Sequence, residues 1–341
     1  MTDAVFPIAA LSDLTDLAAR LPVADGDAAA AARDRQNHLT KPPGSLGRLE
    51  ELAIFLAGWQ GTDRPQIGKA QALVFAGNHG ICAQGVNPYP QEVTAQMVAN
   101  FQAGGAAINQ LCAANGADLS VIALDLDRPT GDFTQGPAMS EAACLDALNR
   151  GAATVDPGAD ILILGEMGIG NSTIAAALSA AVFGGDVADW VGPGTGSDDA
   201  GITRKVAAIQ TGLARHAGLK GDAPGILAAL GGREQAAICG AVLAARAARI
   251  PVVLDGFICT AATAPLHGTD PALLDHCLVG HVSAEPGHRK LLAAMGKDPV
   301  LAFDMRLGEG SGAALALGIL RSALACHNGM ATFGEAGVSG G

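Results

Sequence analysis

The chain has 341 residues, of which 49% are hydrophobic and only 4% aromatic, and its formal net charge is −12 at pH 7. This length, with a positive mean hydropathy of +0.30, is enough for the substantial core of a globular protein. The acidic balance and the scarcity of aromatic side chains argue against nucleic acid as a partner, because such binding needs a basic face and stacking platforms. Any bound anion must be held by a few local groups.

The cysteines and the N-terminus indicate the compartment. The seven cysteines stand in apolar segments without a C-x-x-C pair, which is typical of buried thiols in a reducing environment. The first residues include an acid, Asp3, where a signal peptide needs positive charge, and no apolar run reaches the length of a membrane span. We expect a cytoplasmic protein with no membrane partner.

The order of apolar segments predicts the fold. Helix-like patterns cover residues 8–20 and 27–39, and a loop at 41–48 opens another helix at 49–57. From residue 70 onward, alanine-rich helical stretches alternate with short apolar runs, which lie at 72–76, 119–124, 161–164 and 252–254. This alternation predicts an α/β fold with a buried, mainly parallel sheet. Ligands of such sheets bind beyond the carboxyl ends of the strands, so the loops that follow these runs are the expected site.

The loop after the first run leads into a helix that starts near Pro90. Tyr89, Val93 and Met97 then follow at a spacing of four residues, so they form one stripe that either lines a pocket for a flat aromatic ligand or belongs to the core. His79 and Cys82 have a spacing that suits a metal ion, but no second pair accompanies them. A structural zinc needs four ligands, so the sequence favours no metal site.

The third apolar run ends in a turn that contains an acid and several glycines. Its candidate residues are Glu166, Gly168, Gly170, Asn171, Ser172 and Thr173, followed by a helix expected at 174–181. The three polar residues can cap that helix, whose free N–H groups form an anion site. The turn lacks the Gly-Lys-Ser/Thr of a nucleoside-triphosphate loop. The alternatives are close approach of a ligand, which so many glycines favour, or an ordinary capped helix.

Two further segments suggest anion and sugar contacts. Gly192, Gly194 and Thr195 form a turn that can wrap a phosphate, and Lys205 on the next helix is a candidate point charge or a solvated lysine. The fourth run ends in a single acid, Asp255, rather than the paired acids typical of magnesium–diphosphate chemistry. We therefore expect Asp255 to contact a sugar hydroxyl or a turn. The polar segment 281–288 suits a wall of the site, without an assigned role.

The most informative turn lies near the C-terminus, where Gly308, Gly310 and Gly312 remove side chains between an apolar segment and an Ala/Leu helix. Arg306 and Glu309 flank these glycines. A guanidinium suits capture of a phosphate, and a carboxylate in a partly apolar turn can have a pKa raised towards that of a general base. The alternative is a surface Arg–Glu pair at a helix start.

Taken together, five segments resemble the nicotinate-nucleotide–dimethylbenzimidazole phosphoribosyltransferase family: 41–48, 89–94, 165–173, 254–257 and 305–312. The resemblance implies transfer of phosphoribose from nicotinate mononucleotide to 5,6-dimethylbenzimidazole or a related azole, giving the α-ribazole 5′-phosphate of the cobalamin lower ligand. It also implies a homodimer with sites near the interface. The expected fold is a Rossmann-like α/β domain over residues 65–305 with a small helical domain formed by 1–64 and 306–341.

The same resemblance assigns roles to residues. Glu309 corresponds to the catalytic glutamate and Glu166 to a second glutamate that faces the ribose. Phosphate and ribose contacts fall on Arg306, Lys205, Gly168, Gly170, Asn171, Ser172, Thr173, Gly192, Gly194, Thr195 and Asp255, and the base site on Tyr89, Val93, Met97 and Leu307. No metal or other cofactor is expected, because the departing nicotinate already carries a positive ring nitrogen in the donor. Two alternatives stay open, a nucleosidase-like hydrolase and a nucleotide sensor without activity.

Overall fold

The computed structural model describes residues 6–339. Its elements, in chain order and with 3-10 helices marked η, are η1 Leu11–Leu14, η2 Ala18–Arg20, α1 Gly26–His38, α2 Arg48–Gln60, β1 Ala70–Ala76, η3 Gly80–Gln84, α3 Glu92–Gln102, α4 Ala107–Asn115, β2 Ala117–Ala123, α5 Glu141–Ala153, β3 Ile161–Met167, α6 Asn171–Phe183, η4 Val187–Asp189, α7 Asp199–Arg215, η5 Ala217–Leu219, α8 Ala223–Leu230, α9 Arg233–Ala247, β4 Val252–Leu254, α10 Phe257–Ala262, α11 Ala264–Thr269, η6 Pro271–Leu274, β5 Cys277–His281, α12 Pro286–Met295, β6 Pro299–Leu301, α13 Ser311–Gly329 and α14 Phe333–Ala336.

The strands form one six-stranded sheet in the order β2-β1-β3-β4-β5-β6, and every neighbouring pair is parallel. The predicted α/β class is confirmed, and each of the four apolar runs contains or overlaps a strand. β5 and β6 were not expected from the sequence. β5 ends in Gly280 and His281, and β6 is only three residues long and begins with Pro299, so neither resembles an apolar run.

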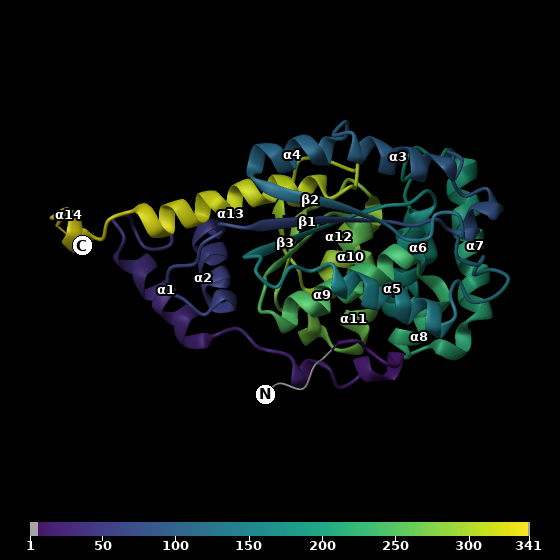
Figure 1. Ribbon diagram of the computed structural model, residues 1–341, viewed down its shortest axis with the longest axis horizontal. Coiled ribbons are helices and arrows are strands. Elements are labelled where there is room, and N and C mark those ends of the chain that lie inside the picture. Colours follow the sequence, from purple (N-terminus) through teal and green to yellow (C-terminus); the bar gives the residue numbers. More distant parts are fainter. Residues whose placement is uncertain (1–5, 340–341) are drawn as a thin grey trace.

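Side chains of the central strands alternate between two cores, as the pleat of a strand requires. Leu73, Phe75 and Leu162 pack into a core with helices α5, α6, α8 and α9. Val74 and Ile163 point to the other face, into a core with α2, α4 and α13. Figure 1 shows these helices as layers on the two sides of the sheet. Because the strands are covered on both faces, they read as continuous apolar runs in the sequence.

The N-terminal segment differs from its prediction. Residues 8–20 form two short 3-10 helices, η1 and η2, rather than one α-helix. Leu11, Leu14 and Leu17 recur every three residues, which matches the repeat of a 3-10 helix. These leucines join the core that contains α5 and α8. The helices predicted at 27–39 and 49–57 correspond to α1 and α2.

Helix α13 connects two regions of the molecule. It begins at the carboxyl edge of the sheet, packs on β5 and α4, and then reaches the pair formed by α1 and α2, as Figure 1 shows in yellow. The predicted division into a large domain (65–305) and a small helical domain stays a prediction, and residues 1–5 and 340–341 of the latter lie outside the described part of the chain. Within residues 6–339, no helix combines the length and the apolar character needed to cross a membrane.

Candidate active site

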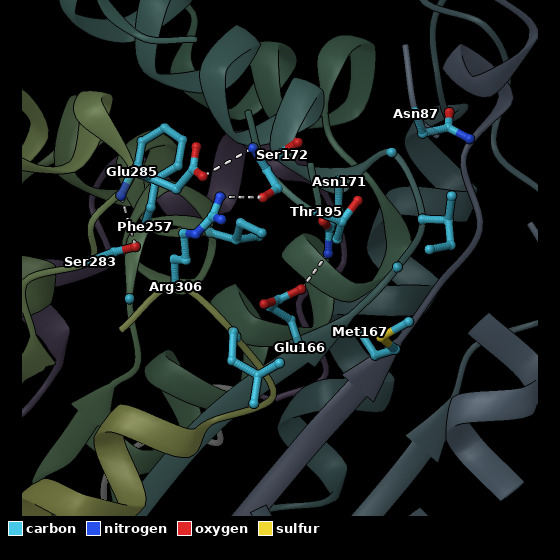
Figure 2. A pocket seen from close by; sticks show the side chains of 18 of the residues that line it. Asn87, Glu166, Met167, Asn171, Ser172, Thr195, Phe257, Ser283, Glu285 and Arg306 are labelled. Carbon is cyan, nitrogen blue, oxygen red and sulfur yellow. Dashed lines mark hydrogen bonds between the residues drawn. The ribbon is translucent and has the colours of Figure 1, made fainter. Parts of the chain in front are cut away.

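A cavity lies beyond the carboxyl ends of the central strands, where ligands of parallel sheets bind. The space between its walls is about 760 Å³ when the part open to solvent is included. The walls come from the segments that follow β1, β3, β4 and β5, from the loop before α7 and from the turn before α13. Figure 2 shows Glu166, Ser172, Glu285 and Arg306 around this space.

Glu166 stands near the end of β3 and lines the cavity although its side chain is buried. Its Oε2 accepts a hydrogen bond from the Asn171 side-chain amide, drawn as a dashed line in Figure 2. Burial, with the nearby charges of Asp255 and Glu234, raises the pKa of Glu166 to about 8. This carboxyl group is therefore mostly protonated at neutral pH, when the cavity holds no cation to stabilise its charge.

The glycines of the β3 turn allow close packing of backbone. A Cβ at Gly168 would lie 2.7 Å from the carbonyl oxygen of Gly77, and Gly170 has a φ of +93°. Helix α6 starts directly after Gly170, without a hydrogen bond from a capping side chain. The predicted capping by Asn171, Ser172 and Thr173 is therefore wrong.

The polar side chains at the start of α6 have other partners. Asn171 bonds Glu166, and the Ser172 hydroxyl accepts a hydrogen bond of 3.2 Å from the Lys205 Nζ. Thr173 is completely buried. No side chain caps this helix, although the N–H groups of Asn171 and Thr173 already donate to the carbonyl oxygens of Gly168 and Gly170. Helix N-termini suit anions, and Ser172 in this first turn lines the cavity.

Lys205 supplies a cation at this helix start, where it bonds Ser172, and its side chain is buried. Besides its bond to Ser172, the amine donates to the carbonyl oxygen of Gly192 at 3.1 Å. Burial lowers the pKa of Lys205, and the carboxylate of Glu285 opposes this shift. The lysines that form ion pairs in the described part of the chain are Lys41, Lys69 and Lys290, and Lys205 is not among them.

The loop at 192–196 completes this end of the cavity, with Gly194 and Thr195 in its lining. The N–H of Gly194 donates to Glu285 Oε1 at 3.0 Å, and Gly194 takes a φ of +57°. A Cβ there would lie 2.7 Å from the Ser172 hydroxyl oxygen. The predicted phosphate residues Gly192, Ser172, Gly194 and Lys205 are thus brought together.

Arg306, Leu307 and Gly308 line the mouth of the cavity. The Arg306 guanidinium is exposed and donates one long hydrogen bond, 3.4 Å, to the carbonyl oxygen of Gly194. Leu307 is 55% exposed. A Cβ at Gly308 would lie 2.6 Å from Glu166 Oε1, so this turn passes directly over Glu166.

Glu309 adjoins the cavity lining but is not part of it. It adopts the left-handed conformation with φ +65°, which is uncommon for a residue with a side chain. Its side chain is buried, and its Oε2 has no hydrogen-bond partner among the described residues. Burial raises the pKa of Glu309, the charge of Asp255 adds to this, and the backbone N–H of Ile108 opposes it.

Asp255 follows β4 and holds the start of α13. Its carboxylate accepts from the N–H groups of Gly310, Gly312 and Ala313 at 3.1, 2.8 and 3.0 Å. Asp255 was expected to contact either a sugar hydroxyl or a turn, and the contact with the turn is observed. His281 Nε2 lies 3.5 Å from Asp255 Oδ1. Burial raises the pKa of Asp255, while His281 and these N–H groups oppose the shift.

The predicted base-binding stripe lies outside the cavity lining. Tyr89 is 50% exposed, and Val93 and Met97 on α3 are half-buried. Met97 packs against the same core as Met167, which does line the cavity. The role of these three residues in binding a base therefore stays a prediction, and Leu307 is the member of the predicted base set that lines the cavity.

Several site residues had no assigned role in the sequence analysis. His281, Ser283 and Glu285 line the cavity, in the polar segment 281–288 whose pattern suits a wall of the site. His79 and Glu234 form a completely buried pair, with Nε2 and Oε1 2.6 Å apart. They are far apart in the chain, and no local signal pairs them.

Comparisons with known proteins agree on one family. A family model described as phosphoribosyltransferase matches residues 21–338. The chain is 69% identical over 328 residues to the nicotinate-nucleotide–dimethylbenzimidazole phosphoribosyltransferase of Rhodobacter capsulatus, covering 96% of this chain and 98% of that protein. A protein of the same name from Mesorhizobium japonicum is 59% identical over 333 residues, covering 98% of this chain and 99% of the relative.

The fold is similar to a solved structure with the same designation. The crystal structure of nicotinate-nucleotide–dimethylbenzimidazole phosphoribosyltransferase from Thermus thermophilus superposes with a TM-score of 0.85 at 42% sequence identity. The match covers 93% of this chain and 100% of the solved chain. The two proteins are therefore similar in sequence as well as in fold.

Proposed function

Because this chain belongs to the nicotinate-nucleotide–dimethylbenzimidazole phosphoribosyltransferase family, we propose that it transfers phosphoribose from nicotinate mononucleotide to 5,6-dimethylbenzimidazole. The products are α-ribazole 5′-phosphate and nicotinate, and the reaction belongs to the assembly of the cobalamin lower ligand. The family match over nearly the full chain supports this activity.

The reaction exchanges one carbon–nitrogen bond for another at ribose C1′. The bond to the nicotinate nitrogen breaks, and its electron pair returns to the ring, which loses its positive charge and leaves as nicotinate. A benzimidazole nitrogen forms the new bond, and the proton on the other benzimidazole nitrogen goes to a base. A metal to stabilise the leaving group is unnecessary, since departure removes charge from the ring.

One observation carries the assignment of the site to this reaction: the cavity has an anion-binding end and an acidic end. Lys205, Ser172 and the N-terminus of α6 lie at the first end and suit the 5′-phosphate. Glu166 lies at the second end, where Met167 and Leu307 supply apolar surface. A nucleotide with its phosphate at Lys205 would place its ribose near Glu166.

We assign the two glutamates different roles because their surroundings differ. Glu309 would accept the benzimidazole proton, which requires its ionised form, and its raised pKa makes it a stronger base. Glu166 would face the ribose. A bound nicotinate ring carries positive charge, which favours the ionised form of Glu166 and lowers its pKa from about 8. The ionised carboxylate then stabilises positive charge that develops at C1′.

We also propose a homodimer in the cytoplasm. Phe303 and Leu307, in the segment that carries Arg306, are 64% and 55% exposed, and Leu307 also lines the cavity; a second subunit would cover these apolar side chains. The chain mass is 34.0 kDa, so sedimentation analysis separates monomer from dimer. A purely monomeric protein at the concentration of the assay would contradict the dimer.

The activity is tested by mixing the purified protein with nicotinate mononucleotide, with and without 5,6-dimethylbenzimidazole, and identifying the products by mass. We expect nicotinate and a benzimidazole ribotide only when both substrates are present. Nicotinate without the acceptor would instead indicate the hydrolase, and no product with any azole would indicate a binding protein.

A further inference from the structure

Another carboxyl group, that of Glu285, lies at the phosphate end of the cavity. The proposed reaction assigns no role to it. Its side chain is buried and lines the cavity beside Lys205 and Ser172. Figure 2 shows Glu285 on the same side of the cavity as Ser172. An acid at a site for a phosphate is unexpected, because two like charges in a buried site repel each other.

The contacts of Glu285 fix its position and leave one oxygen unused. Oε1 accepts from the N–H of Gly194 at 3.0 Å, and the backbone N–H of Glu285 donates to the Ser283 hydroxyl at 3.2 Å. Oε2 is buried without a hydrogen-bond partner among residues 6–339. A Cβ at Gly192 would lie 2.1 Å from this oxygen, so Oε2 faces the backbone of the phosphate loop.

The charges that face Glu285 come from two other elements. Lys205 on α7 and Arg306 in the turn before α13 both favour its ionised form, as does the N–H of Gly194. Burial acts in the opposite direction and is the larger effect, so the pKa of Glu285 lies above its ordinary value. The charge of Glu285 therefore depends on whether Lys205 and Arg306 have another anion as partner.

A phosphomonoester provides such an anion. Near neutral pH it carries a charge of about −1.5 to −2. When the phosphate oxygens contact Lys205 and Arg306, these two cations are shared between the phosphate and the Glu285 carboxylate. The phosphate brings up to two negative charges, so an ionised Glu285 would add a third in a buried site. Such a carboxyl group takes up a proton, since burial and a like charge both raise the pKa of an acid.

We propose that Glu285 takes up one proton from solvent when the 5′-phosphate of the nucleotide binds, so that its carboxyl group is neutral in the complex. One O–H bond forms on the carboxylate, and no other bond forms or breaks. The site recognises a phosphomonoester together with a proton. This inference rests on the proposed function, because it places the nucleotide phosphate beside Lys205.

The wild-type protein provides the first test. Titration calorimetry with nicotinate mononucleotide, without acceptor, in buffers of different ionisation enthalpy measures the protons taken up. Nicotinate riboside, which lacks the phosphate, is the matched ligand, because its nicotinate ring causes the same proton release from Glu166. At about pH 7.5 we expect about one proton more per site with the nucleotide than with the riboside, and the ratio of nucleotide to riboside affinity should fall about tenfold per pH unit above the pKa of free Glu285.

Glu285→Gln is the decisive variant, since its side-chain oxygen can still accept from Gly194 and its amide is neutral, as the protonated acid is. We expect the proton uptake with nicotinate mononucleotide to equal that with nicotinate riboside, and the ratio of the two affinities to be nearly independent of pH over the same range. Glu51→Gln, on the exposed side of α2, is the control variant and should keep the wild-type uptake.

The outcomes separate this inference from the proposed function. If nicotinate mononucleotide binds and reacts but takes up no more protons than the riboside, the role of Glu285 is wrong and the function stands. Wild-type proton uptake in Glu285→Gln has the same meaning, because the proton then goes elsewhere. If the protein neither binds nor converts the nucleotide, the proposed function and the role of Glu285 both fail.

Discussion

The carboxylate of Asp255 at the end of β4 accepts a hydrogen bond of 2.8 Å from the N–H of Gly312 at the start of α13. Asp255 also accepts from Gly310 and Ala313, so one side chain holds the whole turn that contains Glu309. On its other side this turn contacts β3, because a Cβ at Gly165 would lie 2.5 Å from the carbonyl oxygen of Glu309. The segments that carry Glu166 and Glu309 are therefore in direct backbone contact.

Gly165→Ala tests this contact. The added methyl group would meet the backbone of Glu309 and Gly310 at about 2.5 Å, which forces the turn away from the strand. We expect a loss of about 1–3 kcal/mol in the free energy of unfolding, measured by denaturant titration, together with lower turnover. Gly218→Ala is the control, because a Cβ there meets no atom within 4 Å. Equal stability of the two variants would contradict the close contact.

Glu309→Gln removes the proposed base while keeping the size of the side chain. We expect turnover to fall about 10²–10⁴-fold, as for a lost general base, with little change in the KM for nicotinate mononucleotide. Steady-state kinetics with both substrates varied provides the measurement. Unchanged turnover would leave Glu309 with a structural role only.

Lys205→Met removes the buried charge at the phosphate end and keeps an apolar stem of similar length. A hydrogen bond to a charged group contributes about 1.5–3 kcal/mol, so the KM for the nucleotide should rise about 10- to 100-fold. Arg306→Ala should raise this KM less, because the guanidinium is exposed and makes a single 3.4 Å bond in the protein. A KM change confined to the benzimidazole would overturn both assignments.

Glu166→Gln should change how stability depends on pH. Burial in the folded protein holds the pKa of Glu166 at about 8, above its ordinary value of 4.5. Between these pH values the unfolded chain releases a proton that the folded chain retains, so stability is full below about pH 4.5 and is lost as pH rises through about 8. The loss is on the order of 5 kcal/mol for this group.

The neutral amide of Glu166→Gln cannot ionise, so its free energy of unfolding should fall less steeply over this range. Denaturant titrations at a series of pH values, compared between wild type and variant, isolate this group from the other acids. Parallel curves for the two proteins would mean that Glu166 is not protonated in the folded state.

Much of this site was predictable because its signals are local. Glu166, Lys205 and Glu309 each stand in or near a glycine turn that the sequence displays directly, and β1 to β4 are apolar runs because both faces of the sheet are covered. The parallel α/β class follows from such runs alternating with helices. The order of the five motif segments was enough to suggest the family.

Tertiary structure decided what depends on residues that are distant in the chain. Asn171 bonds Glu166 instead of capping α6, because the turn places that carboxyl group within reach. The pairing of His79 with Glu234 and the position of Glu285 beside Lys205 arise only when separate strands end at one edge of the sheet. Sequence spacing specifies turns and periodic faces, whereas burial and charge at a residue depend on every element that packs around it.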